Sequence, residues 1–498
     1  MKPETIRRVW AASEKMAGRC DIMELLAEIG DKRDFKFDEI LGMWGEYTNK
    51  VKDGFLPELI SLYVHIPFCI KKCAYCIYYS YAPKDSGEID AYLDYLDELC
   101  ENYSQFFKGL KLRTLFIGGG TPTLPPDAQM ERMLNSIFSK FEFDFLGEMC
   151  CETNPMTATE NKIRMLRQRG FNRVSMGVQT FSRKALKLCG RDYQDKARVL
   201  EMIEMINSFD FERGLNIDLI AGLNGDTADS FIETFSQVAA LKPRHITVQP
   251  LYKNSNYNQR YMNEYSNSES GCASGSDDIH ARVRSDLARI AVENDYACDS
   301  LSQTGVWTFN EQSRLREQPM AKRFDAKDIS ACPENAPASC GQYRFPMEDD
   351  SFETQMIRKR VDDQFGYDDL NLHPFSLLSI GPTSRSHIFS FSDYKSSETK
   401  NFYIDRESDI YPGMKYGMGY EMTRFVLLSL RREHLISRDH FKMEFGLEIE
   451  NVFEDQIKAL QETGKLEQDK SLYRVATEEE KDVLFCAFVF ATKKMNKA

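Results

Sequence analysis

Three cysteines stand close together in the segment Tyr63-Val-His-Ile-Pro-Phe-Cys69-Ile-Lys-Lys-Cys73-Ala-Tyr-Cys76. Their C-x3-C-x2-C spacing puts three possible thiolate ligands on one loop, directly after an apolar run that predicts a buried strand over Leu62–Ile66. Structural zinc sites and iron–sulfur clusters usually take four protein ligands. Three close cysteines with no obvious fourth therefore indicate a cubane cluster with one iron left open for a non-protein ligand.

Two other interpretations of this loop are weaker. The cysteines could be core residues beside a strand, or they could form a zinc knuckle completed by His65. Strand alternation should point His65 away from the loop, which argues against the zinc site. The other cysteines are scattered, and most are expected to fill the core; Cys332 and Cys340, at C-x7-C, are interpreted as ordinary loop residues rather than a second metal site.

Further polar and glycine motifs follow later predicted strands. Gly118-Gly-Gly-Thr-Pro122 would let the backbone approach a ligand closely and expose N–H donors. Glu152 closes a third strand, where its carboxylate could bind a ribose or an amino group or simply be solvated. Gln179, Arg191 and Asp218 offer an amide, a guanidinium and a carboxylate. Because an acid in an apolar strand is costly unless paired or bound, Asp218 needs a partner: either a ligand or an ion pair with Arg191.

Strand and helix patterns alternate through residues 61–252, which predicts parallel strands with crossover helices. Functional groups gather at the C-terminal ends of the strands in such folds, where all these motifs lie. Six units are too few to close an eight-stranded barrel, so we expect an α/β fold, a partial (βα)6 TIM-type barrel. The expected strands are Leu62–Ile66, Thr114–Ile117, Glu148–Glu152, Arg173–Gly177, Leu215–Ile220 and His245–Gln249; the expected helices are Ile89–Phe107, Ala128–Phe141, Ala158–Gln168, Gln194–Ser208 and Ser230–Leu241.

Four regions are expected along the chain. Residues 1–60 form an N-terminal helical extension, 61–260 the barrel, and 261–415 the completion of the barrel with flexible insertions or a lid. Residues 264–279 and about 321–352 are the expected loops. Residues 416–498 form a C-terminal α+β, winged-helix-like domain, with helices over Tyr420–Arg432 and Val452–Glu462 and a hairpin over Leu466–Val475.

Composition limits the class of protein. With 498 residues, the chain can bury a large core. A net charge of −13 argues against general nucleic-acid binding. No apolar run reaches the length of a membrane span, and Met1–Arg19 is charged without an apolar signal core, so we expect a cytoplasmic protein without a membrane partner.

The cysteine motif after a strand resembles the radical S-adenosylmethionine (SAM) superfamily. The motifs Tyr-Val-His-Ile-Pro-Phe-Cys and Gly-Gly-Gly-Thr-Pro-Thr resemble those of one branch of this superfamily. That branch contains oxygen-independent coproporphyrinogen III oxidases, haem-chaperone-like proteins and class C radical SAM methylases. The resemblance extends from about Leu62 to Tyr252, and weaker similarity is found near Gly381 and in the C-terminal hundred residues.

This resemblance implies a 4Fe-4S cluster on Cys69, Cys73 and Cys76, and two SAM molecules. Tyr63, Tyr75 and Glu152 match SAM contacts in the family, and Gly119 matches a contact to the first SAM. The matches to contacts with the second SAM are Gly120, Thr121, Gln179, Arg191, Asp218 and Tyr252. The cluster delivers an electron to SAM, so the resemblance also implies an electron donor such as flavodoxin or ferredoxin.

Departures from the family narrow the expected reaction. Coproporphyrinogen oxidases carry another cysteine two residues after the last ligand, where this chain has Tyr78, and their Arg-Tyr-Thr-Ser-Tyr-Pro-like N-terminal segment is missing from residues 1–60. Chaperone-like relatives are shorter and show Asp-Phe where this chain has Ile77-Tyr78. We therefore expect methyl or methylene transfer from a second SAM to an unsaturated small molecule, with His387 as a guess for the proton-transfer residue. The alternatives are coproporphyrinogen-type oxidative decarboxylation and a haem chaperone that retains the cluster.

Overall fold

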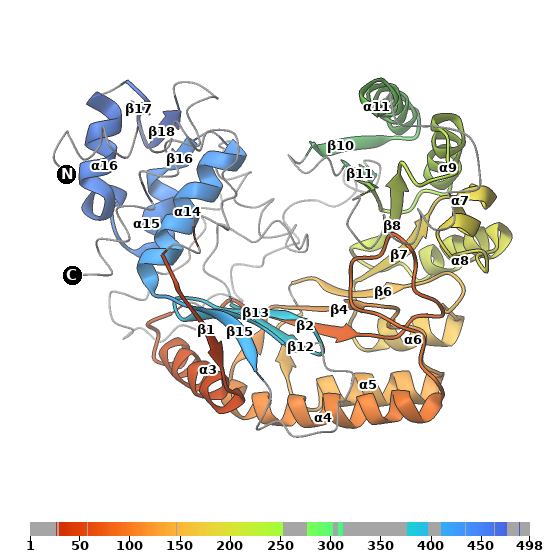
Figure 1. Ribbon diagram of the computed structural model, residues 1–498, viewed down its shortest axis with the longest axis horizontal. Helices are drawn as coiled ribbons and strands as arrows, with labels where there is room; N and C mark the ends of the chain where they lie inside the picture. Colours follow the sequence, from red (N-terminus) through yellow and green to blue (C-terminus); the bar gives the residue numbers. More distant parts are fainter. Residues whose placement is uncertain are drawn as a thin grey trace.

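A central barrel-like sheet dominates the computed structural model (Figure 1), which describes residues 26, 29–56, 58–145, 147–251, 276–301, 307–311, 376–396, 410–433, 435–462, 464–475 and 488. Six strands run parallel, as the sequence predicts. The strands and their crossover helices are β2 (Ile60–Ile66), α4 (Ser86–Phe107), β4 (Thr114–Gly119), α5 (Asp127–Phe138), β6 (Met149–Thr153), α6 (Glu160–Gln168), β7 (Arg173–Gln179), α7 (Arg183–Leu188), α8 (Lys196–Ser208), β8 (Gly214–Ala221), α9 (Ala228–Ala240) and β9 (His245–Pro250). The partial TIM-type barrel is confirmed.

Further strands widen this sheet on both sides, in the order β1-β15-β14-β13-β12-β2-β4-β6-β7-β8-β9-β11-β10. Strand β12 is parallel to β2, and the other added pairings are antiparallel. The added strands are β1 (Asp31–Phe35), β10 (Tyr296–Leu301), β11 (Trp307–Glu311), β12 (Ser376–Ile380), β13 (Arg385–Ile388), β14 (Ser392–Lys395) and β15 (Tyr411–Lys415); β3 (Lys111–Leu112) and β5 (Glu142–Phe143) form a separate pair.

Two expectations from the sequence need correction. Residues 1–60 are not purely helical: ahead of α3 (Phe37–Lys52), β1 forms the edge of the sheet by pairing with β15. The loop expected over 264–279 ends sooner, because helix α11 (Ser276–Glu293) begins inside it. Tyr252, Cys332 and Cys340 lie outside the described residues.

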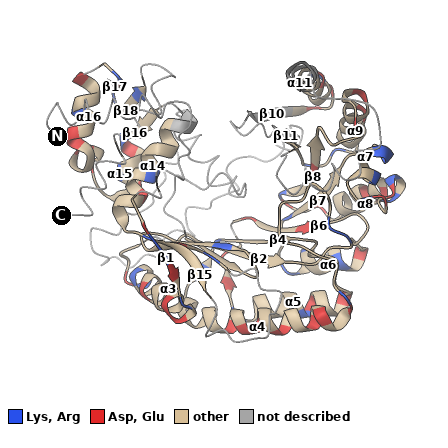
Figure 2. Ribbon diagram, viewed as in Figure 1, with Lys and Arg blue, Asp and Glu red and all other residues tan. Residues whose placement is uncertain are grey.

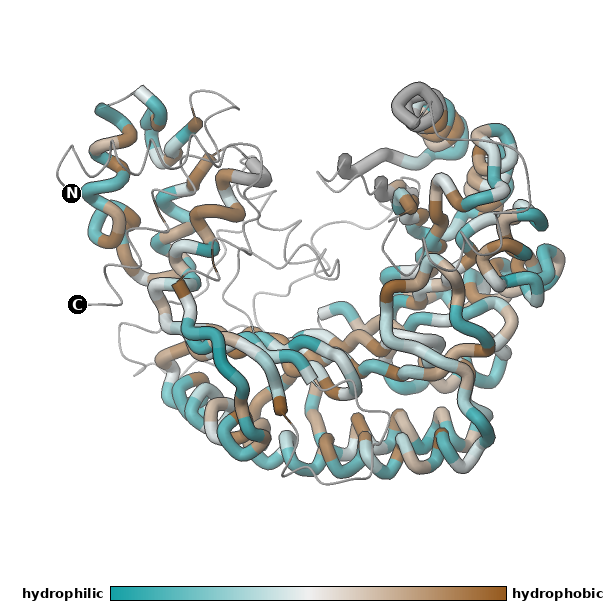
Figure 3. The backbone as a smooth tube through the Cα atoms, in the orientation of Figure 1, coloured by the Kyte–Doolittle hydropathy of each residue, from teal (hydrophilic) through white to brown (hydrophobic). Residues whose placement is uncertain are grey.

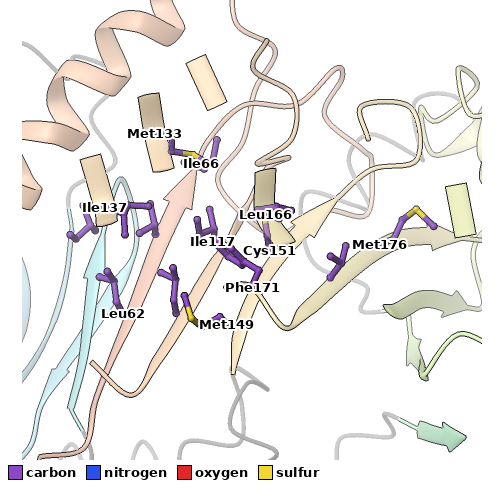
Figure 4. Packing of buried hydrophobic residues seen from close by; sticks show 14 of the residues in the cluster. Leu62, Ile66, Ile117, Met133, Ile137, Met149, Cys151, Leu166, Phe171 and Met176 are labelled. Carbon is purple, nitrogen blue, oxygen red and sulfur yellow. The ribbon is translucent and has the colours of Figure 1, made fainter. Parts of the chain in front are cut away.

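One face of the sheet packs against helices, and its residues alternate with those of the opposite face. In β2, Leu62, Val64 and Ile66 belong to the main hydrophobic core, and Figure 4 shows Leu62, Ile66 and Ile117 on the side of α5. The covering helices are amphipathic; along α4 and α5, Figure 3 shows hydrophobic and hydrophilic residues in alternation. Their N-termini are capped locally, for example by Asp85, which accepts a hydrogen bond from the Glu88 N–H at the start of α4.

The C-terminal module has its own hydrophobic core and a winged-helix-like topology. Its elements are α14 (Met418–Glu433), β16 (Leu435–Ser437), α15 (Arg438–Phe445), α16 (Ile449–Glu462), β17 (Leu466–Asp469) and β18 (Leu472–Val475), and its small sheet has the order β16-β18-β17. The predicted helices and the predicted hairpin are all present. Figure 1 shows the module at one end of an open arch, with α9 and α11 at the other. In the described part of the chain, no helix combines the length and apolar character of a membrane span.

Candidate functional site

The candidate site lies on the inner face of the sheet, opposite the helix-covered face. Because Leu62, Val64 and Ile66 face the core, the residues between them in β2 face inward. The same alternation places the predicted ligand-binding residues of β4, β6, β7 and β8 inward, toward the C-terminal ends of their strands. One side of one sheet therefore carries Tyr63, Gly118, Glu152, Gly177 and Asp218.

The cysteine loop leaves the end of β2 and is fixed at both ends. The Cys69 N–H donates to the Tyr81 carbonyl and the Tyr81 N–H donates to the Pro67 carbonyl, each at 2.9 Å. The Ala74 N–H donates to the carbonyl of Cys189, just after α7, at 2.9 Å. Lys72 donates to the Tyr78 carbonyl and to the Ser80 hydroxyl. These contacts hold the loop over the end of the barrel.

The three cysteines are half-buried, and their thiols lie close enough together to affect one another's pKa. Burial raises the pKa of Cys69 and of Cys76, and proximity to Cys73 raises both further, whereas the Lys72 ammonium opposes the change. A cation beside the loop favours thiolates, the form that binds metal.

The donor set suits a cluster better than a single ion. Among the residues that the structure describes, no three His, Cys, Asp or Glu side chains converge as one metal ion requires. Sulfurs spread over one loop can bind separate irons of a cluster, whereas tetrahedral zinc draws all of its ligands to one centre. Cys100, Cys150, Cys151 and Cys189 are buried, and two of them, Cys100 and Cys151, belong to the main hydrophobic core as expected.

His65 is a structural support of the loop. Its Nε2 lies 2.8 Å from the Tyr79 carbonyl, which can only accept, so Nε2 carries the proton. Nδ1 then accepts from the Tyr63 hydroxyl at 2.9 Å. Burial lowers the pKa of His65 to about 4, so the imidazole is neutral at physiological pH. The structure thus gives this histidine a role other than zinc ligation, but the expectation that its ring points away from the loop is wrong, because the ring contacts the loop at Tyr79.

Glycines at the end of β4 allow the loop to pack closely. Gly119 has φ +108°, and a Cβ there would lie 2.7 Å from the His65 ring. A Cβ on Gly120 would lie 2.6 Å from the Phe68 carbonyl oxygen, and the Gly120 N–H donates to the Ile66 carbonyl at 2.6 Å. These two positions therefore need glycine for the contact between β4 and the cysteine loop, whether or not they also contact SAM.

Glu152 faces Gly119 across the inner surface. The Gly119 N–H donates to Glu152 Oε2 at 3.0 Å. Burial and the nearby charge of Asp218 raise the pKa of Glu152 to about 8, despite this hydrogen bond. A ligand that brings positive charge or hydrogen-bond donors would stabilise the ionised form of this carboxyl group.

A bulge at the end of β7 positions Gln179. The register with β8 shifts between Gly177 and Gln179, and Gln179 has φ +69°, which is unusual for a residue with a side chain. A Cβ on Gly177 would lie 2.7 Å from Gln179 Nε2 and 3.7 Å from Arg191 Nη1. The amide and the guanidinium therefore meet above Gly177.

Arg191 is buried and only partly satisfied. It donates to the Tyr75 hydroxyl at 3.1 Å, to the Gly177 carbonyl at 2.6 Å and to Gln194 Oε1 at 2.9 Å. Its Nε has no hydrogen-bond partner although it is buried. An orphaned guanidinium nitrogen at this position suits a carboxylate on a bound ligand.

Asp218 faces Gly177 in the sheet register and is held by neighbouring strands. It accepts from the Ser175 hydroxyl at 2.7 Å and from the Asn216 amide at 3.0 Å, and burial raises its pKa. Its partners differ from those of Arg191, so the alternative of an ion pair between the two residues is wrong.

The remaining sequence candidates divide into three groups. Tyr75 and Thr121 are in the site: Tyr75 contacts Arg191, and the Thr121 hydroxyl lies 3.6 Å from the Cys69 sulfur. Tyr252 is not described. His387 lies away from the cysteine loop. It pairs with Leu377 in β12, and Leu377 pairs with Ser61 at the start of β2, whereas the cysteine loop follows the end of β2.

Two cations missed by the sequence reasoning lie on the inner face near the site. Arg385 in β13 and Lys395 in β14 are directly opposite each other. Both alternate with residues that face the main core, so both point inward. They therefore place two positive charges on this face. The signal in the sequence was weak, because the strands that pair these residues are only four residues long.

Family models match two parts of the chain. The radical SAM superfamily model matches residues 63–238, which include the cysteine loop and the inner-face residues through Asp218. The HemN C-terminal domain model matches residues 421–478, in the winged-helix-like module.

Curated relatives match the barrel region. Oxygen-independent coproporphyrinogen III oxidase from Escherichia coli K12 is 35% identical over 189 residues, which are 38% of this chain and 41% of that protein. The haem chaperone HemW from Buchnera aphidicola subsp. Acyrthosiphon pisum (strain APS) is 34% identical over 188 residues, or 38% of this chain and 49% of that protein. The matches thus span less than half the length of either relative.

One solved structure resembles nearly the whole chain. Coproporphyrinogen III oxidase (HemN) from Escherichia coli, a radical SAM enzyme, has a TM-score of 0.64 and 20% identity, covering 93% of this chain and 94% of that one. At this identity the similarity establishes the fold.

Proposed function

We propose that this chain, which matches the radical SAM superfamily over residues 63–238 and the HemN C-terminal domain over residues 421–478, cleaves SAM reductively and uses a second SAM for methyl or methylene transfer to an unsaturated small molecule. The observation that carries this proposal is a pair of recognition sets on the inner face. One contains Glu152 with Gly119, and the other contains Gln179, Arg191 and Asp218.

Cys69, Cys73 and Cys76 would hold a 4Fe-4S cluster. When bound, the cluster supplies the electron that breaks a sulfur–carbon bond of SAM and yields methionine and a 5′-deoxyadenosyl radical. Glu152 would bind donors of the first SAM. The orphaned nitrogen of Arg191 would bind a SAM carboxylate, while Asp218 would accept from its amino group or ribose. Two sulfonium groups on one inner face bring the methyl donor close to the radical.

Isotope transfer tests the proposal without knowledge of the substrate. Reconstituted protein is reduced anaerobically with SAM that carries a trideuterated methyl group, and the 5′-deoxyadenosine is analysed by mass spectrometry. We expect deuterium in the 5′-deoxyadenosine, because the radical abstracts hydrogen from the methyl group of the second SAM. Cys73→Ser should hold less iron and give no product. Unlabelled 5′-deoxyadenosine from the wild type would contradict the two-SAM proposal while preserving reductive cleavage.

Oxidative decarboxylation is a second candidate. Arg385 and Lys395 support it, because two inward-facing cations two and three strand spacings, roughly 10 and 15 Å, from β2 suit the carboxylates of a substrate. The relatives named coproporphyrinogen III oxidase support the same reaction. Carbon dioxide formed from coproporphyrinogen III, and lost in Arg385→Gln, would favour this candidate; S-adenosylhomocysteine formed together with 5′-deoxyadenosine would favour transfer.

A further inference from the structure

The cysteine loop exposes large apolar side chains. Ile70, Ile77 and Tyr78 are 38%, 58% and 47% exposed. They are three of eight large apolar residues exposed in the described part of the chain, yet they occupy only nine consecutive positions. Scattered exposed apolar residues need no explanation, but a local group of them is typical of an interaction surface.

Lysines border this apolar group. Lys71 is exposed on the loop, and Lys184 and Lys187 are exposed on α7, which is blue in Figure 2. The loop contacts the segment that directly follows α7: the Ala74 N–H donates to the Cys189 carbonyl, and a Cβ on Gly190 would lie 3.4 Å from Lys71 Cε. Asp192 forms an exposed ion pair with Lys71 at 3.3 Å, so the cations still outnumber the acids here. This local positive charge stands out on a protein with a net charge of −13.

We infer that this basic face, defined as Ile70, Lys71, Ile77, Tyr78, Lys184 and Lys187, is the docking surface for a small acidic protein that donates one electron at a time. The inference rests on the proposed function. An apolar centre with a charged rim is the usual anatomy of an interface, and complementary charge accelerates association with an acidic partner.

The position of the face supports this partner. Ile70, Ile77 and Tyr78 are exposed on the same loop that carries Cys69, Cys73 and Cys76, each one or two residues from a cysteine. A donor bound to these side chains is therefore close to the cysteines. The donor loses one electron, and that electron cleaves one SAM to methionine and an adenosyl radical.

Binding to bacterial flavodoxin tests the inference independently of catalysis. Isothermal titration of the cluster-reconstituted full chain should give a dissociation constant that increases with salt. Lys184→Glu combined with Lys187→Glu should weaken binding at least about tenfold at low salt, because it reverses the rim charge. Lys111→Glu, at an equally exposed lysine in β3, should leave the affinity unchanged. Equal affinity of the double variant and the wild type would overturn the inference.

Dithionite separates this inference from the proposed function. With dithionite as reductant, the double variant should form 5′-deoxyadenosine at the wild-type rate, while the flavodoxin-driven rate falls. If reconstituted wild type forms none with dithionite, the proposed function fails. If gel filtration shows instead that the two lysine changes dissolve a dimer of this chain, the face joins two copies and the electron-donor inference is wrong.

Discussion

At the scale of single residues, the site depends on close contacts as much as on polar groups. Gly119 and Gly120 lie where a side chain would meet His65 or the carbonyls of the cysteine loop. The neutral imidazole of His65, in turn, joins Tyr63 in β2 to Tyr79 beyond the last cysteine. The position of the thiols therefore depends on contacts of neighbouring residues as well as on those that the cysteines make themselves.

Gly120→Ala should impair cluster incorporation. Its Cβ would lie 2.6 Å from a backbone carbonyl of the loop, so the loop must move. We expect less iron and sulfide per chain after reconstitution, together with a lower melting temperature. Gly42→Ala is the matched control: no atom lies within 4 Å of its Cβ, and alanine stabilises a helix interior by about 1 kcal/mol relative to glycine. Equal iron content in both variants would refute this account of Gly120.

Glu152→Gln should separate stability from SAM binding. The carboxyl pKa of Glu152 rises from 4.5 to about 8 in the folded protein, so the unfolded chain loses its proton first as the pH rises. The wild type is therefore progressively destabilised between pH 4.5 and pH 8, and above pH 8 the penalty is complete.

We expect the melting temperature of the SAM-free Glu152→Gln variant to exceed that of the wild type by a margin that grows across this pH range. Its SAM affinity should fall about tenfold or more, because a hydrogen bond to a charged group is worth about 1.5–3 kcal/mol. Glu131→Gln, at an exposed glutamate on α5, should change neither quantity. A melting-temperature difference that is independent of pH would show that the carboxyl group does not titrate in this way.

At the scale of elements, β7 shows how a strand end can direct side chains. The bulge between Gly177 and Gln179 interrupts the register with β8 and brings the Gln179 amide toward Arg191. Bulges often re-aim side chains beside functional sites. The left-handed backbone at Gln179 is a local cost that the rest of the strand must stabilise.

Gln179→Gly and Gln179→Ala should differ in stability but agree in function. Glycine accepts the positive φ without strain, so Gln179→Gly should be about 1 kcal/mol more stable than Gln179→Ala. Both variants lack the amide, and both should bind SAM more weakly by equilibrium dialysis of the reconstituted protein. If the alanine variant were the more stable one, the backbone conformation at this bulge would be wrong.

At the scale of the whole molecule, a buried polar cluster joins the sheet to the C-terminal module. His387 Nδ1 lies 2.6 Å from Asp393 Oδ1 and 2.7 Å from the Tyr416 hydroxyl. On α14, Glu421 lies 3.3 Å from His387 Nε2 and accepts from the Ser390 N–H at 3.1 Å. The histidine that the sequence suggested for proton transfer thus helps to attach one module to the other.

Glu421→Gln should loosen this attachment. The change removes the charge that faces His387 and Arg424 in a buried environment, and breaking a buried pair typically costs about 3–5 kcal/mol. Calorimetry should show a lower first unfolding transition, whereas Glu467→Gln, on the exposed side of β17, should leave it in place. An unchanged transition in Glu421→Gln would mean that the module is held by its apolar contacts alone.

The sequence by itself determined the parallel barrel, the winged-helix-like module and the loop that carries the three cysteines. Apolar periodicity and the spacing of Cys69, Cys73 and Cys76 are local properties of the chain, so they can be read without contacts. Only the tertiary structure decided the edge strand β1, the role of His387 and the opposition of Arg385 to Lys395. Each of these depends on pairing between segments far apart in the chain, and strand register, which no local pattern encodes, sets which side chains meet.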